Sequence, residues 1–310
     1  MPQLMEHLSI LSPPDVAGYE SMTYPYFRPK LQLAAPQGPV IAVGVSENGQ
    51  PLGLALGEIP SPDAPAEALS LFVCAGARRR GLGTALLSRL ESAFAARGCG
   101  TIHLVFATGG PATPALERIL AKLGWEPPVP RMLLCEVGER ILRAGWMQQR
   151  PISAPFEIFS WCDLKLEERE RILHQQQVQP WFPENLSPFG SEKTIEPLNS
   201  LGLRFEGEVV GWIITHRIGP TRIRYSFFFV RKDLRGRRIG LPLLVAAIRR
   251  QADGLGLDST AVFGAWQDNP SMMRFLKRQV LPYLDAVRET VGASKTLVPP
   301  RTAADTTRDA

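Results

Sequence analysis

The length and composition of the chain exclude several classes of protein. It has 310 residues, room for about two ordinary domains, and its 45% of apolar residues is too high for a disordered chain. The net charge of +5 suits an anionic ligand but is mild for a nucleic-acid-binding protein. Because no apolar run has the roughly 18–20 residues of a membrane span and no signal peptide is visible, we expect a cytoplasmic protein.

The first half of the chain predicts a sheet that is interrupted by two helices. Apolar runs at Val40–Ser46 and Pro51–Gly57 flank Glu47-Asn48-Gly49, a pattern that favours a β-hairpin. Strands are also predicted at Ala68–Val73 and Thr101–Phe106, and Met132–Val137 is expected to close the sheet of this half. Apolar residues at helical spacing follow the two middle strands: Leu82, Leu86, Leu87, Leu90 and Phe94, then Leu116, Ile119, Leu120 and Leu123.

The second half repeats this order of elements. Strands are predicted at Leu201–Phe205, Val209–Arg217, Ile223–Val230 and Ser259–Val262. A helix with the apolar residues Leu241, Leu244, Val245 and Ile248 follows the third strand, and Asn269 is expected to cap a later helix. Both halves therefore predict an α/β fold with a mixed sheet.

Two pairs of matching motifs indicate that the halves arose by duplication. Gly83 and Gly240, in arginine-rich turns that open helices, lie 157 positions apart. Tyr26 and Trp181, in the loops Pro25-Tyr26-Phe27-Arg28-Pro29 and Pro180-Trp181-Phe182-Pro183, lie 155 positions apart. We therefore expect domains at 1–147 and 156–298, a linker at 148–155 and a disordered tail at 299–310.

The turn Arg78-Arg79-Arg80-Gly81-Leu82-Gly83 carries the clearest chemical signal. The first turn of a helix has unpaired N–H groups and a positive dipole end, and glycines allow close approach of the backbone to a phosphate. A Rossmann turn would need glycine in place of Leu86, and a Walker loop would need Gly-Lys-Ser/Thr. The turn therefore indicates a pyrophosphate site, with a solvated basic face as the alternative.

The stretch from Val73 to Leu87 resembles the acetyl-CoA motif of the GCN5-related N-acetyltransferase (GNAT) superfamily, and Ala121-Lys122-Leu123-Gly124-Trp125 resembles the end of its later helix. The resemblance covers about residues 40–136 and 156–297, in a tandem layout similar to that of the mycothiol synthases. It implies two GNAT-like domains in which the CoA pyrophosphate lies on the N-terminus of the first helix. The pantetheine arm would lie between two splayed parallel strands, and an amine would attack the acyl carbonyl directly.

The resemblance also implies which residues bind acyl-CoA. The second turn departs from the family pattern, because Arg238 stands where the first turn has Gly81, and we expect the first half to be the better binder. The implied residues of the first half are Val73, Arg78, Arg79, Arg80, Gly81, Leu82, Gly83 and Thr84. Those of the second half are Val230, Arg235, Gly236, Arg238 and Gly240.

The candidates for a general base are Glu67, Tyr225 and Ser226, each of which could instead be a solvated or sheet-face residue. A structural role is favoured for His103 and His216. The tyrosine that protonates the leaving thiolate in this family is replaced by Leu120 in the first half and Leu276 in the second. Aromatic residues lie where the family's first helices line the acceptor site, with core anchoring as the alternative: Tyr24, Tyr26, Phe27, Trp181, Phe182 and Phe189.

These observations favour an N-acetyltransferase that uses acetyl-CoA as co-substrate and acts on the amine of a small molecule or peptide. Two alternatives stay open: a partly degenerate, non-catalytic acyl-CoA-binding protein, and a nucleic-acid-binding protein that uses the basic clusters. We expect neither nucleic acid nor membrane as a partner, and a monomer or homodimer. No cluster of His, Cys and Asp has metal-ligand spacing, and the four cysteines have no CxxC pattern, so no metal is expected.

Overall fold

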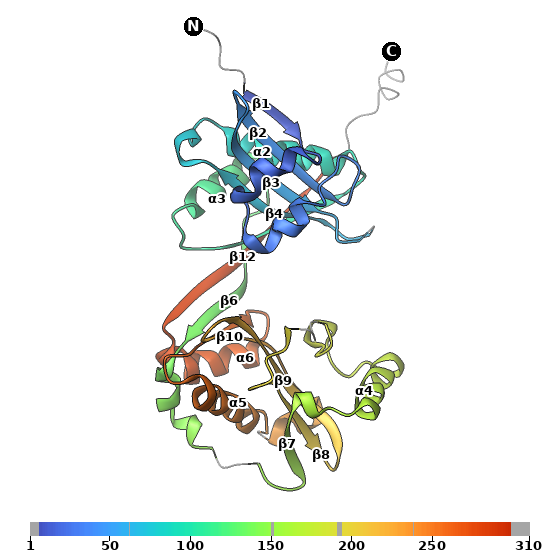
Figure 1. The fold of residues 1–310 in the computed structure, drawn as a ribbon, viewed down its shortest axis with the longest axis vertical. Helices are drawn as coiled ribbons and strands as arrows, with labels where there is room; N and C mark the ends of the chain where they lie inside the picture. The colour runs from blue at the N-terminus through green and yellow to red at the C-terminus, as the bar shows by residue number, and fades with distance from the viewer. Residues whose placement is uncertain (1–5, 62, 150–151, 191–193, 238, 299–310) are drawn as a thin grey trace. The chain divides into compact units, whose positions relative to one another are not determined.

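The computed structural model describes residues 6–61, 63–149, 152–190, 194–237 and 239–298 (Figure 1). The chain divides into two compact units, which we call unit 1 (residues 1–131 and 290–310) and unit 2 (residues 132–289). Both have the mixed α/β fold that the sequence predicts. The predicted tail at 299–310 and residues 150–151 of the predicted linker lie outside the described residues. The domain limits of the sequence repeat, at 147 and 156, stay a prediction.

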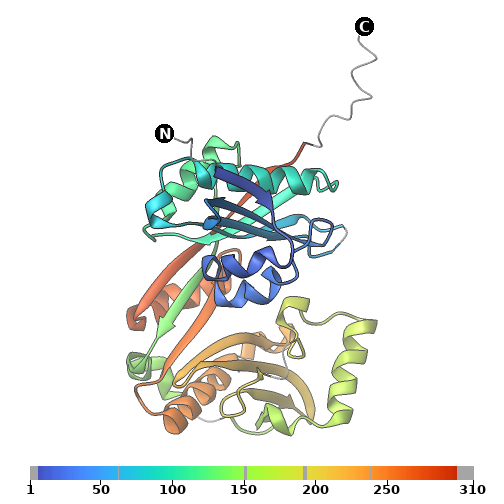
Figure 2. The same ribbon diagram turned by 45° about the horizontal axis from the view of Figure 1, so that its top comes forward.

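Unit 1 contains a mixed sheet with the strand order β1-β2-β3-β4-β5-β12. Helices α2 and α3 cover one face, and α1 covers the other together with short 3₁₀ turns over Asp15–Met22 and Pro25–Phe27 (Figure 2). The strands are β1 (Glu6–Ile10), β2 (Val40–Glu47), β3 (Gln50–Glu58), β4 (Ala66–Val73), β5 (Thr101–Ala107) and β12 (Ala286–Thr296). The helices are α1 (Arg28–Leu31), α2 (Leu82–Ala95) and α3 (Thr113–Lys122).

Local sequence explains the main elements of unit 1. The predicted hairpin is confirmed, since β2 and β3 pair through a two-residue turn in which Asn48 (φ 52°) and Gly49 (φ 76°) are left-handed. The apolar stripe of α2 is also confirmed, because Leu86, Leu90 and Phe94 are 0% exposed in the core of the sheet. Burial of each such side chain stabilises the fold by about 1.5–3 kcal/mol. This packing holds the N-terminus of α2 in a fixed place beside the end of β4.

Unit 2 contains a mixed sheet with the strand order β6-β11-β10-β9-β8-β7. Helices α5 and α6 pack on one face and α4 on the other (Figure 1). Asn269 caps α6 as predicted, since its side chain accepts a hydrogen bond from the N–H of Met272. The strands are β6 (Val129–Val137), β7 (Phe156–Ser160), β8 (Leu201–Phe205), β9 (Glu208–Gly219), β10 (Arg222–Val230) and β11 (Thr260–Trp266). The helices are α4 (Leu166–Val178), α5 (Gly240–Leu255) and α6 (Pro270–Phe275).

The expectation that Met132–Val137 closes the sheet of the first half is wrong. This segment is a strand, but it pairs antiparallel with β11, from Ala261↔Val137 to Trp266↔Met132. The edge of β5 is instead paired with β12, from Thr290↔Ala107 to Thr296↔Thr101. The chain leaves unit 1 within β6 and returns within β12. The apolar pattern of β6 is compatible with pairing to β5 or to β11, so the periodicity of the sequence cannot identify the strand with which β6 pairs.

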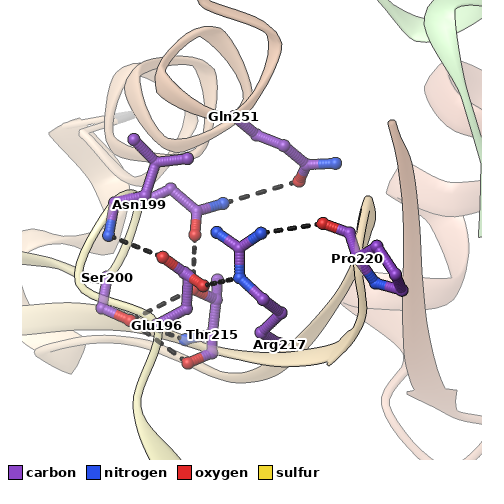
Figure 3. A network of polar contacts seen from close by, with 8 residues as sticks. Glu196, Asn199, Ser200, Thr215, Arg217, Pro220 and Gln251 are labelled. Carbon is purple, nitrogen blue, oxygen red and sulfur yellow. Dashed lines mark hydrogen bonds and ion pairs between the residues drawn. The ribbon is translucent and has the colours of Figure 1, made fainter. Parts of the chain in front are cut away.

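A polar network, buried except for the exposed Arg217, fixes the loop before β8 in unit 2 (Figure 3). Arg217 Nε donates to Glu196 at 2.5 Å, and the hydroxyl of Thr215 donates to Asn199 Oδ1 at 2.6 Å. Asn199 Nδ2 in turn donates to the hydroxyl oxygen of Tyr225 at 3.1 Å. Burial raises the pKa of Tyr225 well above its ordinary value, although the hydrogen bond from Asn199 acts in the opposite direction. Tyr225 is therefore held as a neutral phenol by structural contacts.

Because β12 pairs with β5 and β6 pairs with β11, a destabilising substitution in β12 should open unit 1, and one in β6 should open unit 2. Ala293 in β12 and Val137 in β6 are 5% and 6% exposed, in the cores of unit 1 and unit 2. Because an unpaired buried charge is strongly unfavourable, Ala293→Asp should increase amide exchange in β4 and β5. Val137→Asp should do so in β9 and β10, and hydrogen exchange read by mass spectrometry distinguishes the two. Opening of unit 2 by Ala293→Asp would contradict the strand assignment.

A second prediction concerns alkaline pH. Because the pKa of Tyr225 is raised in the folded state, its contribution to stability is complete below its ordinary pKa of 10 and is lost as the pH rises through the folded value. Tyr225→Phe removes one hydrogen bond, worth about 1 kcal/mol near neutral pH. Thermal unfolding of both proteins should therefore differ at neutral pH and converge above about pH 10. The exposed Tyr24→Phe is the control, and a constant Tyr225→Phe difference at every pH would refute the expectation.

Candidate functional site

Two parallel strands of unit 1 part at the centre of its sheet. β4 and β5 pair from Ala66↔Ile102 to Ala68↔Leu104, and both strands continue beyond these pairs. At the same point β4 contains one extra residue, because Gly57 of β3 faces Ala68 whereas Leu56 faces Ser70. Leu69 is therefore a β-bulge, which bends the strand and leaves its backbone outside the regular ladder.

The bulge also changes which side chains face α2. Ala66 and Ala68 pack in the core under this helix, and so do Leu71 and Val73 further along the strand. Side chains of a regular strand alternate between faces, so even-numbered and odd-numbered residues share a face only if an extra residue lies between them. Leu69 itself packs toward the opposite face, where α1 lies.

A cavity of about 380 Å³ opens where the strands part. Ala68, Leu69 and Val105 form its wall beside the bulge. Its polar wall contains Glu58, Glu67 and His103, which are neighbours in register across β3, β4 and β5. The rest of the wall comes from Tyr26, Phe27, Lys30 and Arg131. The structure thus places the predicted residue Glu67 beside the predicted aromatic loop and beside His103, for which the sequence favours a structural role.

The two carboxylates of this cavity, Glu58 and Glu67, differ in their hydrogen-bond partners. The ammonium group of Lys30 donates hydrogen bonds to both carboxylate oxygens of Glu58. Glu67 is exposed, and its carboxylate has neither a hydrogen bond nor an ion pair with the described residues. Glu67 is therefore available to accept a proton from a molecule in the cavity.

The turn before α2 has a backbone suited to a phosphate group. Arg79 (φ 65°) and Gly81 (φ 86°) are both left-handed, and no side chain caps the helix at Gly81. Nothing lies within 4 Å of the place where a Cβ of Gly81 would be. The free N–H groups of the first helical turn, with half-buried Gly83 and Thr84, are thus accessible to an anion.

The three predicted arginines of this turn have different surroundings. Arg78 Nε donates to the carbonyl oxygen of Val73 at 3.1 Å, which ties the turn to the end of β4. Arg80 forms an ion pair with Glu47 at 2.5 Å and is partly neutralised by it. Arg79 is exposed. Leu82, by contrast, is 4% exposed and anchors the helix in the core.

Unit 2 repeats the parting of strands. β10 and β11 pair from Arg222↔Thr260 to Tyr225↔Phe263, and Ser226 is the extra residue of β10. Ser226 follows Leu69 by 157 positions, the offset that also separates Gly83 and Gly240. The hydroxyl of Ser226 lies 2.7 Å from Nδ1 of His216. The predicted residue Ser226 thus occupies the bulge, whereas Tyr225 belongs to the polar network.

The aromatic loop of unit 2 fills the corresponding region with its own side chains. Trp181 and Phe182 pack edge-to-face on Trp212, with ring centroids 5.5 and 5.0 Å away. Phe229 of β10, which lies beneath them, is 2% exposed, whereas its counterpart Phe72 in β4 is 36% exposed. Trp181 and Phe182 are thus core anchors in unit 2, whereas Tyr26 and Phe27 line a cavity in unit 1. That the loop of unit 1 lines an acceptor site stays a prediction.

The turn before α5 also differs from the turn before α2. Arg235 and Gly236 belong to a 3₁₀ turn over Lys232–Arg237, Arg238 lies outside the described residues, and Gly240 is the first residue of α5. No residue of this turn has a positive φ, as far as the structure describes it. Nearby, the guanidinium of Arg231 lowers the pKa of Asp233 and keeps this carboxylate anionic.

One of the predicted residues of unit 2, Tyr225, lines a small cavity. Tyr225, Ile248 and Gln251 line a cavity of about 30 Å³, which has room for about one water molecule. Val230, at the end of β10, is 7% exposed in the core. Leu120 and Leu276, at the positions of the family's tyrosine, are both 1% exposed, so neither place holds a proton donor.

Sequence reasoning missed part of the cavity of unit 1. Lys30, Glu58 and Arg131 had no motif to mark them, and the bulge at Leu69 depends on the register of β3. His103 could have been identified from the sequence as a neighbour of Glu67, because parallel pairing of β4 and β5 places the two residues side by side. No group of three His, Cys, Asp or Glu side chains able to hold a metal ion occurs among the described residues. Within the same residues, no helix is long and apolar enough to cross a membrane.

Comparison with known proteins identifies the fold. The model of the acetyltransferase (GNAT) family matches residues 4–124 and 159–279, together more than half of the chain. A tandem GNAT protein from the clavulanic acid biosynthesis pathway is similar over 96% of this chain and 100% of its own, with TM-score 0.66 and 16% identity.

Two further solved structures are similar over most of the chain. A GCN5-related N-acetyltransferase from Sphaerobacter thermophilus covers 97% of this chain and 99% of its own, with TM-score 0.59 and 17% identity. A GCN5-related glucosamine N-acetyltransferase region of a fungal GH3 β-N-acetylglucosaminidase covers 94% of this chain and 38% of that chain, with TM-score 0.65 and 14% identity. None of the curated protein sequences matches. The chain belongs to the acetyltransferase (GNAT) family and is a tandem member with two GNAT domains.

Proposed function

We propose that this protein transfers an acetyl or related acyl group from acyl-CoA to an amine, and that unit 1 carries out the reaction. The observation that carries the proposal is the cavity of about 380 Å³ at the parted strands of unit 1. A turn whose backbone suits a phosphate group lies at the end of β4, and the carboxylate of Glu67, which pairs with none of the described residues, lies in the cavity. A cytoplasmic location and the monomeric or dimeric state stay predictions.

Acyl-CoA fits the residues present in unit 1. Its pyrophosphate would bind the N–H groups between Arg79 and Thr84, and its pantetheine arm would lie beside the unpaired backbone at Leu69. The thioester supplies an activated acyl group. The protein holds the two reactants together and provides a proton acceptor, which are contributions of proximity and general-base catalysis.

Glu67 is the proposed proton acceptor. An ammonium group must lose a proton before its nitrogen can attack a carbonyl carbon, and the carboxylate of Glu67 lines the cavity without a partner in the part of the chain that the structure describes. His103, the neighbour of Glu67 in register on β5, is in a position to relay the proton to solvent. Water would protonate the leaving thiolate, because Leu120 offers no donor.

Unit 2 is proposed to have a structural role. Its aromatic loop is packed on Trp212, its turn holds the anionic Asp233, and Tyr225 is engaged by Asn199. The loss of the family's tyrosine at Leu120 and Leu276 supports a second candidate, a protein that binds acyl-CoA without transferring the acyl group. Release of free CoA thiol in the presence of an amine panel distinguishes transfer from binding alone.

The cofactor site is tested by paired substitutions. A Cβ at Gly83 would lie 2.9 Å from the flexible end of Ile119, so Gly83→Asp and Gly83→Asn share the same steric strain and differ in charge. We expect Gly83→Asp to bind CoA at least ~10-fold more weakly than Gly83→Asn, a difference of about 1.4 kcal/mol from repulsion of the pyrophosphate. Calorimetry measures both affinities. Gly240→Asp should leave transfer nearly unchanged, and the reverse pattern would assign the reaction to unit 2.

The proton acceptor is tested by Glu67→Gln. The amide keeps the size of the side chain but cannot accept the proton, so kcat should fall roughly 10²–10⁴-fold. The affinity for CoA should stay unchanged, because Glu67 is not in the turn before α2. The exposed Glu117→Gln on α3 serves as the matched control and should have no effect. A Glu67→Gln variant with the original kcat would remove Glu67 from the mechanism.

A further inference from the structure

We propose that the amine acceptor of unit 1 is an arylalkylamine, a small primary amine that carries one positive charge and an aromatic ring. The proposal rests on the proposed function, since it names the substrate class of the same cavity. It is carried by the carboxylate of Glu67 and by the exposed aromatic loop that contributes Tyr26 and Phe27 to the cavity wall.

The first step is the charge of the acceptor. Lys30 donates hydrogen bonds to both carboxylate oxygens of Glu58, and Arg131 also has an interaction partner already. Glu67, by contrast, pairs with none of the residues that the structure describes. One ammonium group would therefore find a carboxylate in the wall. A second ammonium group, or a carboxylate, would have to compete with contacts that the wall already makes. This arrangement favours a monocation.

The second step is the exposure of the aromatic loop. Tyr26 lines the cavity although it is 80% exposed, and its ring lies edge-to-face with that of Phe27 at a centroid distance of 5.3 Å. Tyr24, which is 68% exposed, meets the ring of Phe27 at 6.1 Å. Large apolar residues that gather on a surface beside a cavity are typical of a ligand-binding site. The loop thus offers aromatic surface to a molecule in the cavity.

The third step is why these rings stay exposed. In unit 2 the corresponding loop packs on Trp212, which faces Phe229 in register. In unit 1 the residue that faces Phe72, the counterpart of Phe229, is Leu54. Leu54 is buried in the core beneath the loop, so a leucine stands where unit 2 has the tryptophan on which its loop packs. An aromatic ligand can supply the edge-to-face partner that the fold supplies in unit 2.

The fourth step is size. A volume of about 380 Å³ is at the lower end for sites of small ligands, which run from about 300 to 1,000 Å³. Ala68, Leu69 and Val105 add apolar surface to the wall. The cavity therefore suits one small apolar molecule, with Glu67 as the partner of its ammonium group and Tyr26 as a contact of its ring.

The test compares amines that differ from phenethylamine in one feature each. The full-length protein is assayed at saturating acetyl-CoA with phenethylamine, with butylamine, which lacks the ring, and with phenylalanine, which adds a carboxylate. Diaminobutane, compared with butylamine, adds a second ammonium group. We expect kcat/KM to favour phenethylamine over each of the other three at least ~10-fold, which corresponds to about 1.4 kcal/mol. A ratio near one or below it, for any of the three, would overturn the proposal.

The role of the loop is tested by substitutions at Tyr26. Because Tyr26 is 80% exposed, its replacement should leave the fold intact. Tyr26→Leu removes the ring and should raise KM for phenethylamine about 3–10-fold, the range of one lost aromatic contact, without changing KM for butylamine. Tyr26→Phe should keep the original KM. Tyr24→Leu, in the same loop but outside the cavity wall, is the matched control. Equal effects of Tyr26→Leu on both amines would contradict the aromatic site.

Equilibrium binding separates the proposal from the proposed function. Calorimetry with CoA present measures phenethylamine and its uncharged analogue phenylethanol without turnover. We expect phenylethanol to bind at least ~10-fold more weakly, and Glu67→Gln to remove this difference. Binding of phenethylamine that both Glu67→Gln and Tyr26→Leu weaken, without release of CoA thiol from acetyl-CoA, would support the site and refute acyl transfer. Transfer to butylamine or phenylalanine, with no binding of phenethylamine, would do the opposite.

Discussion

The extra residue in β4 determines where a ligand has access to unit 1. A sheet normally uses every backbone N–H and C=O group in its ladders, so its interior offers no free donors. The bulge at Leu69 interrupts this pattern where β4 and β5 part, and the cavity lies at the same point. The packing of α2 on the sheet then places an uncapped helix N-terminus at the end of the same strand. The arrangement of the candidate site follows from these two features.

The two units share one architecture but differ in the surroundings of their parted strands. The bulge, the parted strands and the following helix recur in unit 2 at Ser226 and α5. The difference is made by the aromatic loop, whose rings cover Trp212 and Phe229 in unit 2. Aromatic side chains contribute large buried area to a core, so the loop that lines a cavity in one half stabilises the other half.

Local features of the sequence predicted most of the elements, because a hairpin turn, a helix cap or an apolar stripe depends on neighbouring residues. Asn48-Gly49, Asn269 and the stripe of α2 are examples, and the turn at Gly81 is another. Features that depend on distant partners were not predictable in this way. The partner of β6, the register that makes Leu69 a bulge, and the approach of Lys30 and Arg131 to Glu67 each join segments far apart in the chain.

The return of the chain through β12 has a consequence for biosynthesis. The edge of β5 stays unpaired until residues after 290 have been translated, and all of unit 2 is made in between. Joining the two segments of unit 1 across an unstructured connection of this length would cost about 4–5 kcal/mol in chain entropy. Folding of unit 2 removes much of this cost, because the N–H of Asp285 bonds the carbonyl of Glu136 and fixes the two exit points as neighbours. The sheet of unit 1 is therefore completed only after unit 2 has been translated, although every residue that lines the cavity at Leu69 precedes unit 2 in the chain.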